Sequence, residues 1–130
     1  MSEVPWERLT MVAEAAASRA YAPYSRFRVG AAGLVDDGRI VSGCNVENAS
    51  YGLGLCAECG LVSDLVRSGG GRLVAVVCVS PDATKHLMPC GRCRQLLWEH
   101  GTADTLLLGP RGPEPMSAVL PDAFGPDDLG

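Results

Sequence analysis

Lysine is almost absent from this sequence. Lys85 is the only one, beside ten arginines, and the formal net charge is −4. The arginines are scattered and form no basic stripe of the kind that neutralises phosphates, so no nucleic acid is expected as a partner. Histidine is scarce too. We expect His86 in a loop and His100 in the last turn of a helix, and we assign neither to a metal.

Long apolar runs are also missing. No run reaches the ~18 residues that a membrane-spanning helix needs. The first ten residues, MSEVPWERLT, lack the basic start and the apolar core of a secretory signal. The sequence therefore predicts a cytoplasmic protein with no membrane partner. Thiols stay reduced in the cytoplasm, so the six cysteines point to metal binding or catalysis rather than to disulfides.

The chain does contain enough apolar sequence for one core. Its 130 residues, 47% of them hydrophobic, predict a single domain over residues 1–130. Apolar spacing and glycine or proline breaks predict helices over 5–21, 56–68 and 91–100, and strands over 27–35, 39–45, 73–79 and 105–108. Residues 116–120 fit a short helix or a last strand. We expect an α/β fold with three layers, α/β/α, in which helices cover both faces of a mixed sheet of about five strands.

Three cysteines are placed to share one metal ion. Cys90 and Cys93 stand three apart at the start of a predicted helix, so their side chains share a face. Cys56 also begins a predicted helix. The positive end of a helix dipole favours thiolate over thiol. Three thiolates suit Zn²⁺ and leave its fourth position free.

Two alternatives stay open for these cysteines. A Cys-x-x-Cys pair can be a redox device, but that needs a thioredoxin-like unit, and here each pair begins a separate helix. Cys59 lies three residues after Cys56, so a closed cage of four cysteines is the stronger rival. Its two pairs are separated by 30 residues, more than the ~15–20 usual for such modules. Cys44 and Cys78 fall in predicted strands and are interpreted as buried, inert thiols.

Glu58 lies two residues after Cys56. In the first turn of a helix, this offset turns the carboxylate away from the cysteine and toward the mouth of the site. A carboxylate beside a metal-activated water can take its proton and pass it on. Taken alone, Glu58 fits an acid that complements the helix dipole equally well. Beside an open zinc position, the catalytic interpretation is favoured.

These residues resemble the zinc-dependent cytidine deaminases, in the small form in which three cysteines bind the metal. The motifs CAE at 56–58 and PCGRC at 89–93 carry the resemblance. Three further stretches extend it over nearly the whole chain: AYAPYSRFRVGAA at 20–32, GCNVENASYG at 43–52 and LPDAFGPDDL at 120–129. The resemblance implies a cytidine-deaminase-like version of the expected fold.

The resemblance also implies a reaction. One Zn²⁺ per chain is held by Cys56, Cys90 and Cys93, and it lowers the pKa of a bound water toward ~7. The hydroxide attacks C4 of the cytosine ring, while Glu58 takes the water's proton, protonates N3 and then delivers a proton to the leaving amine. Cytidine and 2′-deoxycytidine become uridine and 2′-deoxyuridine with release of ammonia, a step of pyrimidine salvage.

Substrate contacts are implied in the same way. Asn45 and Glu47 resemble the pair that grips the ribose 3′-hydroxyl. Two residues that are two apart on an extended segment point the same way, as such a grip requires. Phe27 resembles an aromatic that packs on the base. Ala57 is expected to bind the base carbonyl through its backbone N–H at a helix N-terminus.

A homotetramer is implied as well, because subunits of the small form complete one another's pockets. Phe124 is expected to be contributed to a neighbouring subunit's pocket, and Tyr51 to reach across an interface. Taken alone, Phe124 fits an anchor for the C-terminal segment.

One position departs from the family pattern. Many members have arginine where this chain has Cys59, and that arginine offsets the charge of the thiolates. Three thiolates and one Zn²⁺ sum to −1, which raises the pKa of the bound water. We hypothesise that the two helix dipoles, helped by Arg92 or Arg94, supply the compensation.

Two other functions remain as alternatives. The first is a deaminase of another aminopyrimidine nucleoside or of cytosine in a polynucleotide. The ribose-gripping segment favours a free nucleoside, and the acidic balance disfavours a polynucleotide. The second is a non-catalytic, zinc-stabilised binding module, which also holds one zinc but leaves the absorbance of added cytidine unchanged.

Overall fold

A mixed sheet forms the centre of the structure, which is a computed structural model describing residues 3–130. Its strands lie in the order β2-β1-β3-β4-β5. Their bounds are Gly30–Val35 (β1), Ile40–Cys44 (β2), Leu73–Val79 (β3), Leu106–Gly109 (β4) and Gly112–Pro115 (β5). Strands β3 and β4 pair in parallel, and the other neighbours pair antiparallel. The expected mixed sheet of about five strands is therefore confirmed.

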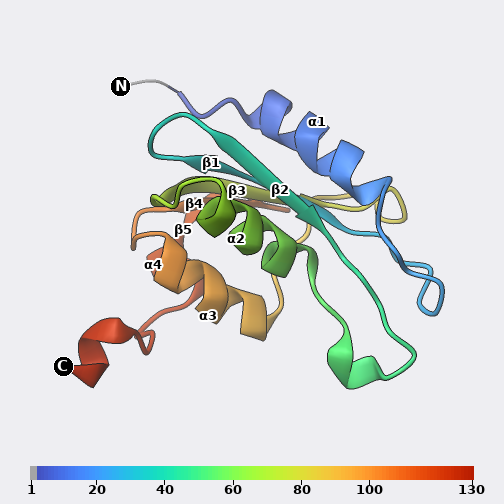
Figure 1. Cartoon of the computed structure of the whole chain (residues 1–130). Coiled ribbons are helices and arrows are strands. Elements are labelled where there is room, and N and C mark those ends of the chain that lie inside the picture. The colour runs from blue at the N-terminus through green and yellow to red at the C-terminus, as the bar shows by residue number, and fades with distance from the viewer. Residues whose placement is uncertain (1–2) are drawn as a thin grey trace.

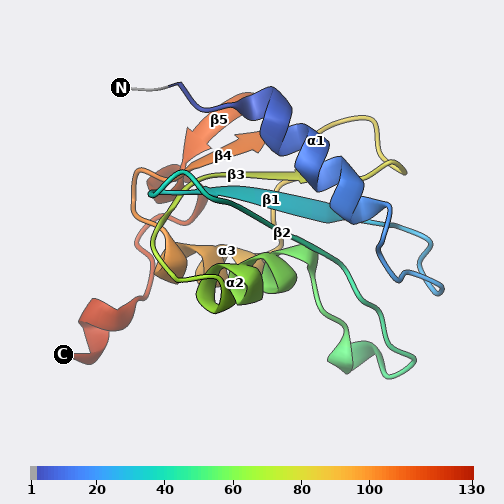
Figure 2. The same ribbon diagram turned by 45° about the horizontal axis from the view of Figure 1, so that its top comes forward.

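Helices cover both faces of this sheet. Helix α1 (Trp6–Ala17) lies on one face, and α2 (Ala57–Arg67) and α3 (Gly91–His100) lie side by side on the other (Figure 1, Figure 2). A short helix, α4 (Met116–Val119), follows β5, and two single turns of 3₁₀ helix, η1 (Tyr51–Leu53) and η2 (Pro126–Leu129), complete the order. The prediction of three layers, α/β/α, is confirmed. No helix within residues 3–130 is long and apolar enough to cross a membrane.

The central strand β3 divides the core into two. Ala75 and Val77 face α1 and pack with Leu9 of that helix, whereas Val76 and Cys78 face α2 and α3. Nearly every residue of β3 is buried, as the continuous apolar run at 73–79 predicted. Because α2 and α3 pack on the same face, their first turns meet above the end of β3. This junction contains the candidate site.

Two glycines let the helices approach the sheet closely. A side chain on Gly30 of β1 would run into the backbone of α1 at Ala13. A side chain on Gly43 of β2 would run into the backbone of α2 at Leu61 and Gly60. A Cβ atom cannot be accommodated at either contact without a backbone shift. Gly43 therefore sets the depth at which α2 lies on the sheet.

Parts of the fold differ from the sequence prediction, and the structure decides one segment that the sequence left open. The first helix ends at Ala17 rather than Tyr21. Tyr21 instead forms a β-bridge opposite Val46, because its backbone N–H donates to the carbonyl oxygen of Asn45 and its carbonyl oxygen accepts from the N–H of Glu47. Strand β5 was not predicted, since its sequence GPEP is rich in residues that rarely form strands. It lies at the edge of the sheet, where proline is tolerated. The undecided segment 116–120 is helix α4.

Candidate active site

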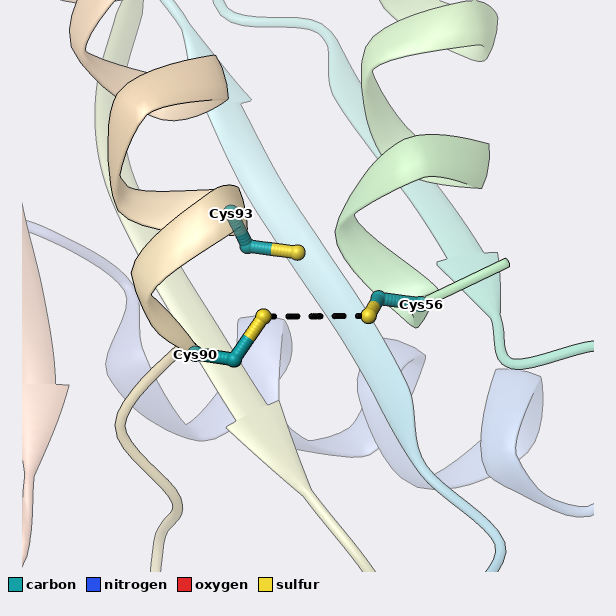
Figure 3. A group of neighbouring side chains, drawn as sticks. All are labelled: Cys56, Cys90 and Cys93. Atoms are coloured by element: carbon teal, nitrogen blue, oxygen red, sulfur yellow. Dashed lines mark hydrogen bonds between the residues drawn. The ribbon is translucent and has the colours of Figure 1, made fainter. Parts of the chain in front are cut away.

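Three cysteine side chains meet where α2 and α3 begin. Cys56 occupies the N-cap position of α2, Cys90 occupies that of α3, and Cys93 lies in the first turn of α3. Their sulfur atoms all lie within 4.8 Å of one another. Figure 3 shows the three side chains pointing into the space between the two helices. The structure thus brings together the three cysteines that the sequence singled out.

The spacing of the sulfurs suits zinc. Two sulfurs bound to one tetrahedral zinc at ~2.3 Å lie about 3.8 Å apart. The Sγ atoms of Cys56 and Cys90 are 3.8 Å apart (Figure 3). Among residues 3–130, this group contains three sulfurs and no fourth ligand. The donor set therefore fits one zinc ion with one position left for another molecule.

Cys59 lies outside the three-sulfur group. Its sulfur instead accepts a hydrogen bond from Nη2 of Arg92, 3.5 Å away. The charges of Cys59 and then of Cys56 raise the pKa of the Arg92 guanidinium. The geometry therefore offers no closed cage of four cysteines, and it places a positive charge beside the sulfurs.

Arg94, the other candidate for charge compensation, has a different task. Its Nε donates to the carbonyl oxygen of Pro89 at 2.9 Å, and its Nη1 donates to that of Val119 at 3.1 Å. These bonds fix the loop before α3 and the end of α4. Of the two arginines in the hypothesis, Arg92 is the one that contacts sulfur.

Burial opposes ionisation at this site. It raises the pKa of the Cys93 thiol far above the usual range, and the negative charge of Glu58 adds to the effect. Burial also raises the pKa of Cys56. At Cys90, burial acts in the same direction, but hydrogen bonds from Cys93 and Cys56 outweigh it and the pKa falls. A divalent cation reverses this balance, because a thiol that coordinates it is deprotonated outright.

Glu58 is buried beside the cysteines, with only 4% of its surface exposed. It occupies the second position of α2, and its Oε2 accepts a hydrogen bond from Sγ of Cys78 at 3.3 Å. Cys78 projects from the end of the central strand β3. The sequence predicted a buried thiol there, but it did not predict the contact with Glu58. A buried carboxylate with so few partners is unusual unless it has a chemical role.

A cavity of about 500 Å³ opens over these groups, within the ~300–1,000 Å³ range of small-molecule sites. Most of the residues proposed from the sequence line it: Phe27, Asn45, Glu47, Tyr51, Cys56, Ala57, Glu58 and Cys90. Cys93 lies beneath them and is fully buried. Phe124 does not line the cavity of its own chain. Its side chain is exposed, and its carbonyl oxygen accepts a hydrogen bond from Gln95.

Asn45 of the cavity wall is bonded to the segment that carries Phe27 and Val29. Its Oδ1 accepts the backbone N–H of Val29 at 2.8 Å, and its Nδ2 donates to the carbonyl oxygen of Phe27 at 2.9 Å. Asn45 thereby fixes the backbone on both sides of residue 28. One N–H of its amide is left for another partner.

Glu47 holds residues 24 and 25, which precede Phe27 in the chain. Its carboxylate accepts hydrogen bonds from the Ser25 hydroxyl and from the backbone N–H groups of Ser25 and Tyr24. The hydroxyl of Ser25 is the main cause of the lowered pKa of Glu47. Glu47 is therefore ionised at neutral pH. Asn45 and Glu47 both line the cavity, and both also order the segment that carries Phe27.

Several cavity residues were not identified from the sequence. Leu87 and Met88 lie in the loop before α3, where no spacing pattern distinguishes them from other loop residues. Tyr24 and Ser25 line an adjoining hollow of about 350 Å³ together with Glu47 and Asn48. Both fall within the stretch at 20–32 that carried the resemblance, and this resemblance is the feature of the sequence that could have identified them.

The fold and the site define a class of protein. An α/β/α sandwich holds three sulfurs at two helix N-termini, spaced for one zinc, beside a buried carboxylate and an open cavity. This arrangement is typical of a zinc-dependent hydrolase. Residues 5–108 match the family described as the cytidine and deoxycytidylate deaminase zinc-binding region. The chain belongs to this family, and its cofactor is zinc.

Similar proteins agree with this assignment. The cytidine deaminase of Mycobacterium tuberculosis (strain ATCC 25618 / H37Rv) is 58% identical over 129 residues, covering 99% of this chain and 96% of that protein. The solved structure of the E47D mutant of the M. tuberculosis enzyme matches with a TM-score of 0.93 at 57% identity, covering 98% of this chain and all of that one. The Mycobacterium leprae cytidine deaminase matches with a TM-score of 0.89 at 55% identity, covering 92% and 100%. The resemblance stated from the sequence is confirmed.

Proposed function

We propose that this protein deaminates cytidine and 2′-deoxycytidine by hydrolysis. The products are uridine or 2′-deoxyuridine and ammonia, and the reaction serves pyrimidine salvage. The observation that carries the proposal is the buried carboxylate of Glu58, which lines the same cavity as the zinc-spaced sulfurs. The 58% identity to a cytidine deaminase over 99% of the chain supports the choice of substrate.

Cys56, Cys90 and Cys93 hold the zinc in this proposal. When bound, zinc supplies the Lewis acidity that makes water a nucleophile at neutral pH. The two helix N-termini favour the negative charge of the sulfurs through their dipoles. Arg92 adds a full positive charge on the outer side of the cluster.

Glu58 moves the protons. Its carboxylate takes a proton from the water that attacks C4 and delivers it to N3 of the ring. Glu58 then carries the second proton of that water, from the hydroxyl now on C4, to the amino group, which leaves as ammonia while C4 becomes a carbonyl. Burial suits this role, because general acid–base catalysis by a positioned group contributes ~10²–10⁴ in rate.

Four residues place the nucleoside over Glu58. Ala57 is the first residue of α2, so its backbone N–H has no partner within the helix and is free for the base carbonyl. Phe27 packs against the base from the opposite wall. Asn45 and Glu47 bind the 3′-hydroxyl. They do so with the amide N–H and the carboxylate lone pairs that are not already bonded to the segment carrying Phe27.

We propose a homotetramer in which neighbouring subunits complete each pocket. Large apolar side chains are exposed around the mouth of the cavity and on the C-terminal segment, among them Tyr24, Val46, Tyr51, Leu53, Leu55 and Phe124. Exposed apolar groups gathered at one site suggest an interface. Phe124 reaches the pocket of a neighbour, and Tyr51 lies at the subunit contact. The chain works as one deaminase domain in the cytoplasm, where its free cysteines stay reduced.

A spectrophotometric assay tests the proposal. Wild-type protein and Glu58→Gln are mixed with cytidine, deoxycytidine and other aminopyrimidine nucleosides, and the loss of substrate absorbance is followed. We expect turnover by the wild type and a loss of at least ~10²-fold in Glu58→Gln at equal zinc content. No turnover by zinc-loaded wild type would identify a binding module. Turnover only of another nucleoside would replace the substrate but keep the mechanism.

A further inference from the structure

Cys78 is the buried group that the reaction described above does not use. It is 3% exposed and lies at the end of β3, paired across the sheet with Ala31 of β1. Its sulfur is 3.3 Å from Oε2 of Glu58. Within residues 3–130, this is the one hydrogen bond found for the Glu58 carboxylate. A strand residue and a helix residue 20 positions apart therefore meet at the proposed proton shuttle.

The contact has a definite donor and acceptor. Burial, and then the negative charge of Glu58, raise the pKa of Cys78 well above the usual thiol value. The thiol therefore stays protonated and donates a hydrogen bond to the carboxylate, rather than competing as a second anion. A thiol is a weak donor, so the bond orients the carboxylate without holding its charge tightly.

The orientation of the Glu58 carboxylate matters because it has two equivalent oxygens, and one of them must face the substrate in the cavity. The first turn of a helix leaves a glutamate side chain several rotamers. Strand β3 is paired on both sides, by β1 and β4, so its backbone is held in place by hydrogen bonds along both edges. A donor on this strand that engages Oε2 leaves the other oxygen for the substrate.

We propose that Cys78 is a positioning residue, whose S–H fixes the carboxylate of Glu58 in the orientation needed for proton transfer. The proposal rests on the proposed role of Glu58. Its rival is a thiol that merely fills the core. The two differ in what serine does at this position, because serine keeps a donor, whereas alanine and valine do not.

The test compares three substitutions at this position with one control. We expect Cys78→Ala and Cys78→Val to lower kcat about three- to tenfold, the range set by one hydrogen bond, with KM changed less than about twofold. Cys78→Ser should retain kcat within about twofold. Val76→Ala is the matched control. It lies two residues earlier on the same face of β3, is equally buried and does not line the cavity, so it should lower the melting temperature and not kcat.

Zinc content and melting temperature are measured for every variant. The proposal is overturned if Cys78→Ala keeps wild-type kcat, if Cys78→Ser falls as far as Cys78→Ala, or if Val76→Ala lowers kcat equally. These outcomes are separate from the failure of the proposed function, which would appear as an active Glu58→Gln.

A spectroscopic measurement keeps the test independent of folding defects in the Cys78 variants. The infrared S–H stretching band of Cys78 is assigned by difference from Cys78→Ser. Replacing Glu58 with alanine removes the acceptor, so the band should move to higher frequency. A band that does not move in Glu58→Ala means that no hydrogen bond exists and ends the proposal.

Discussion

Arg92 donates a hydrogen bond to the sulfur of Cys59 across 3.5 Å, from α3 to α2. The resemblance favours arginine at position 59, where this chain has cysteine, and Arg92 brings a positive charge to that same place from the other helix. The charges of Cys59 and then of Cys56 raise the pKa of the Arg92 guanidinium. The pair therefore offers a specific way to offset the charge of three thiolates.

Removing Arg92 should weaken zinc binding. Partners just outside the ligands commonly contribute ~10–100-fold to metal affinity, and because Arg92 is exposed we expect about three- to tenfold for Arg92→Ala. Competition with a chelator measures the effect, which should shrink as salt is added. Arg67→Ala, which removes an exposed arginine at the far end of α2, is the control. Equal zinc retention in both variants would remove Arg92 from the account.

Removing Arg94 should affect stability instead. Arg94→Ala loses two hydrogen bonds to the carbonyl groups of Pro89 and Val119. We expect a decrease of about 1–3 kcal/mol in the free energy of unfolding, measured in urea. The folded fraction should keep its zinc as tightly as wild type does. A variant that unfolds normally but loses zinc quickly would reverse the roles assigned to the two arginines.

Asp82 should contribute stability that depends on pH. Its carboxylate binds the side chain and the backbone N–H of Arg28, and the side-chain bond is the main cause of its lowered pKa. A pKa lower in the folded than in the unfolded chain means that the unfolded chain binds more protons. The contribution is then present above pH 3.8, the ordinary value, and is lost as the pH falls through the folded value.

Asp82→Asn should therefore be less stable than wild type near neutral pH, and the difference should close in acid. Urea unfolding of both proteins at a series of pH values measures it. Asp104→Asn is the control, because the carboxylate of Asp104 makes no hydrogen bond or ion pair within residues 3–130. A difference that stays constant down to the lowest pH would show that the Arg28 contact is not electrostatic.

Gly43→Ala should displace α2. The new methyl group would meet the backbone of Leu61 and Gly60, which cannot move without shifting the helix that carries Cys56 and Glu58. Overpacking of this kind costs about 1–3 kcal/mol, and activity should fall as well because the site moves. Gly52→Ala is the matched control, since nothing lies within 4 Å of its added methyl group. Equal melting temperatures for the two variants would contradict the close contact.

Local pattern accounts for the parts of this protein that the sequence predicted. Helix periods and a continuous apolar run gave the three layers, and Cys56 and Cys90 were identified because both stand at helix starts. The contact between Cys78 and Glu58 could not be predicted in this way, because it depends on how far α2 is rotated on the sheet. Strand β5 was missed because its pairing with β4, not its own sequence, makes it a strand. The catalytic and binding roles of the site residues stay predictions.

Phe124 provides the sharpest test of the shared pocket. If each pocket takes Glu58 from one subunit and Phe124 from a neighbour, Phe124→Ala and Glu58→Gln damage the same pocket from different chains. Each variant alone should have low activity. Dissociating and reassembling an equal mixture should restore about a quarter of the pockets. These are the pockets in which a Phe124→Ala chain supplies the intact Glu58 and a Glu58→Gln chain supplies the intact Phe124. Activity no greater than the mean of the two separate variants would place Phe124 outside the neighbour's pocket. Its 58% exposure in its own chain would then mark only a loose C-terminal segment.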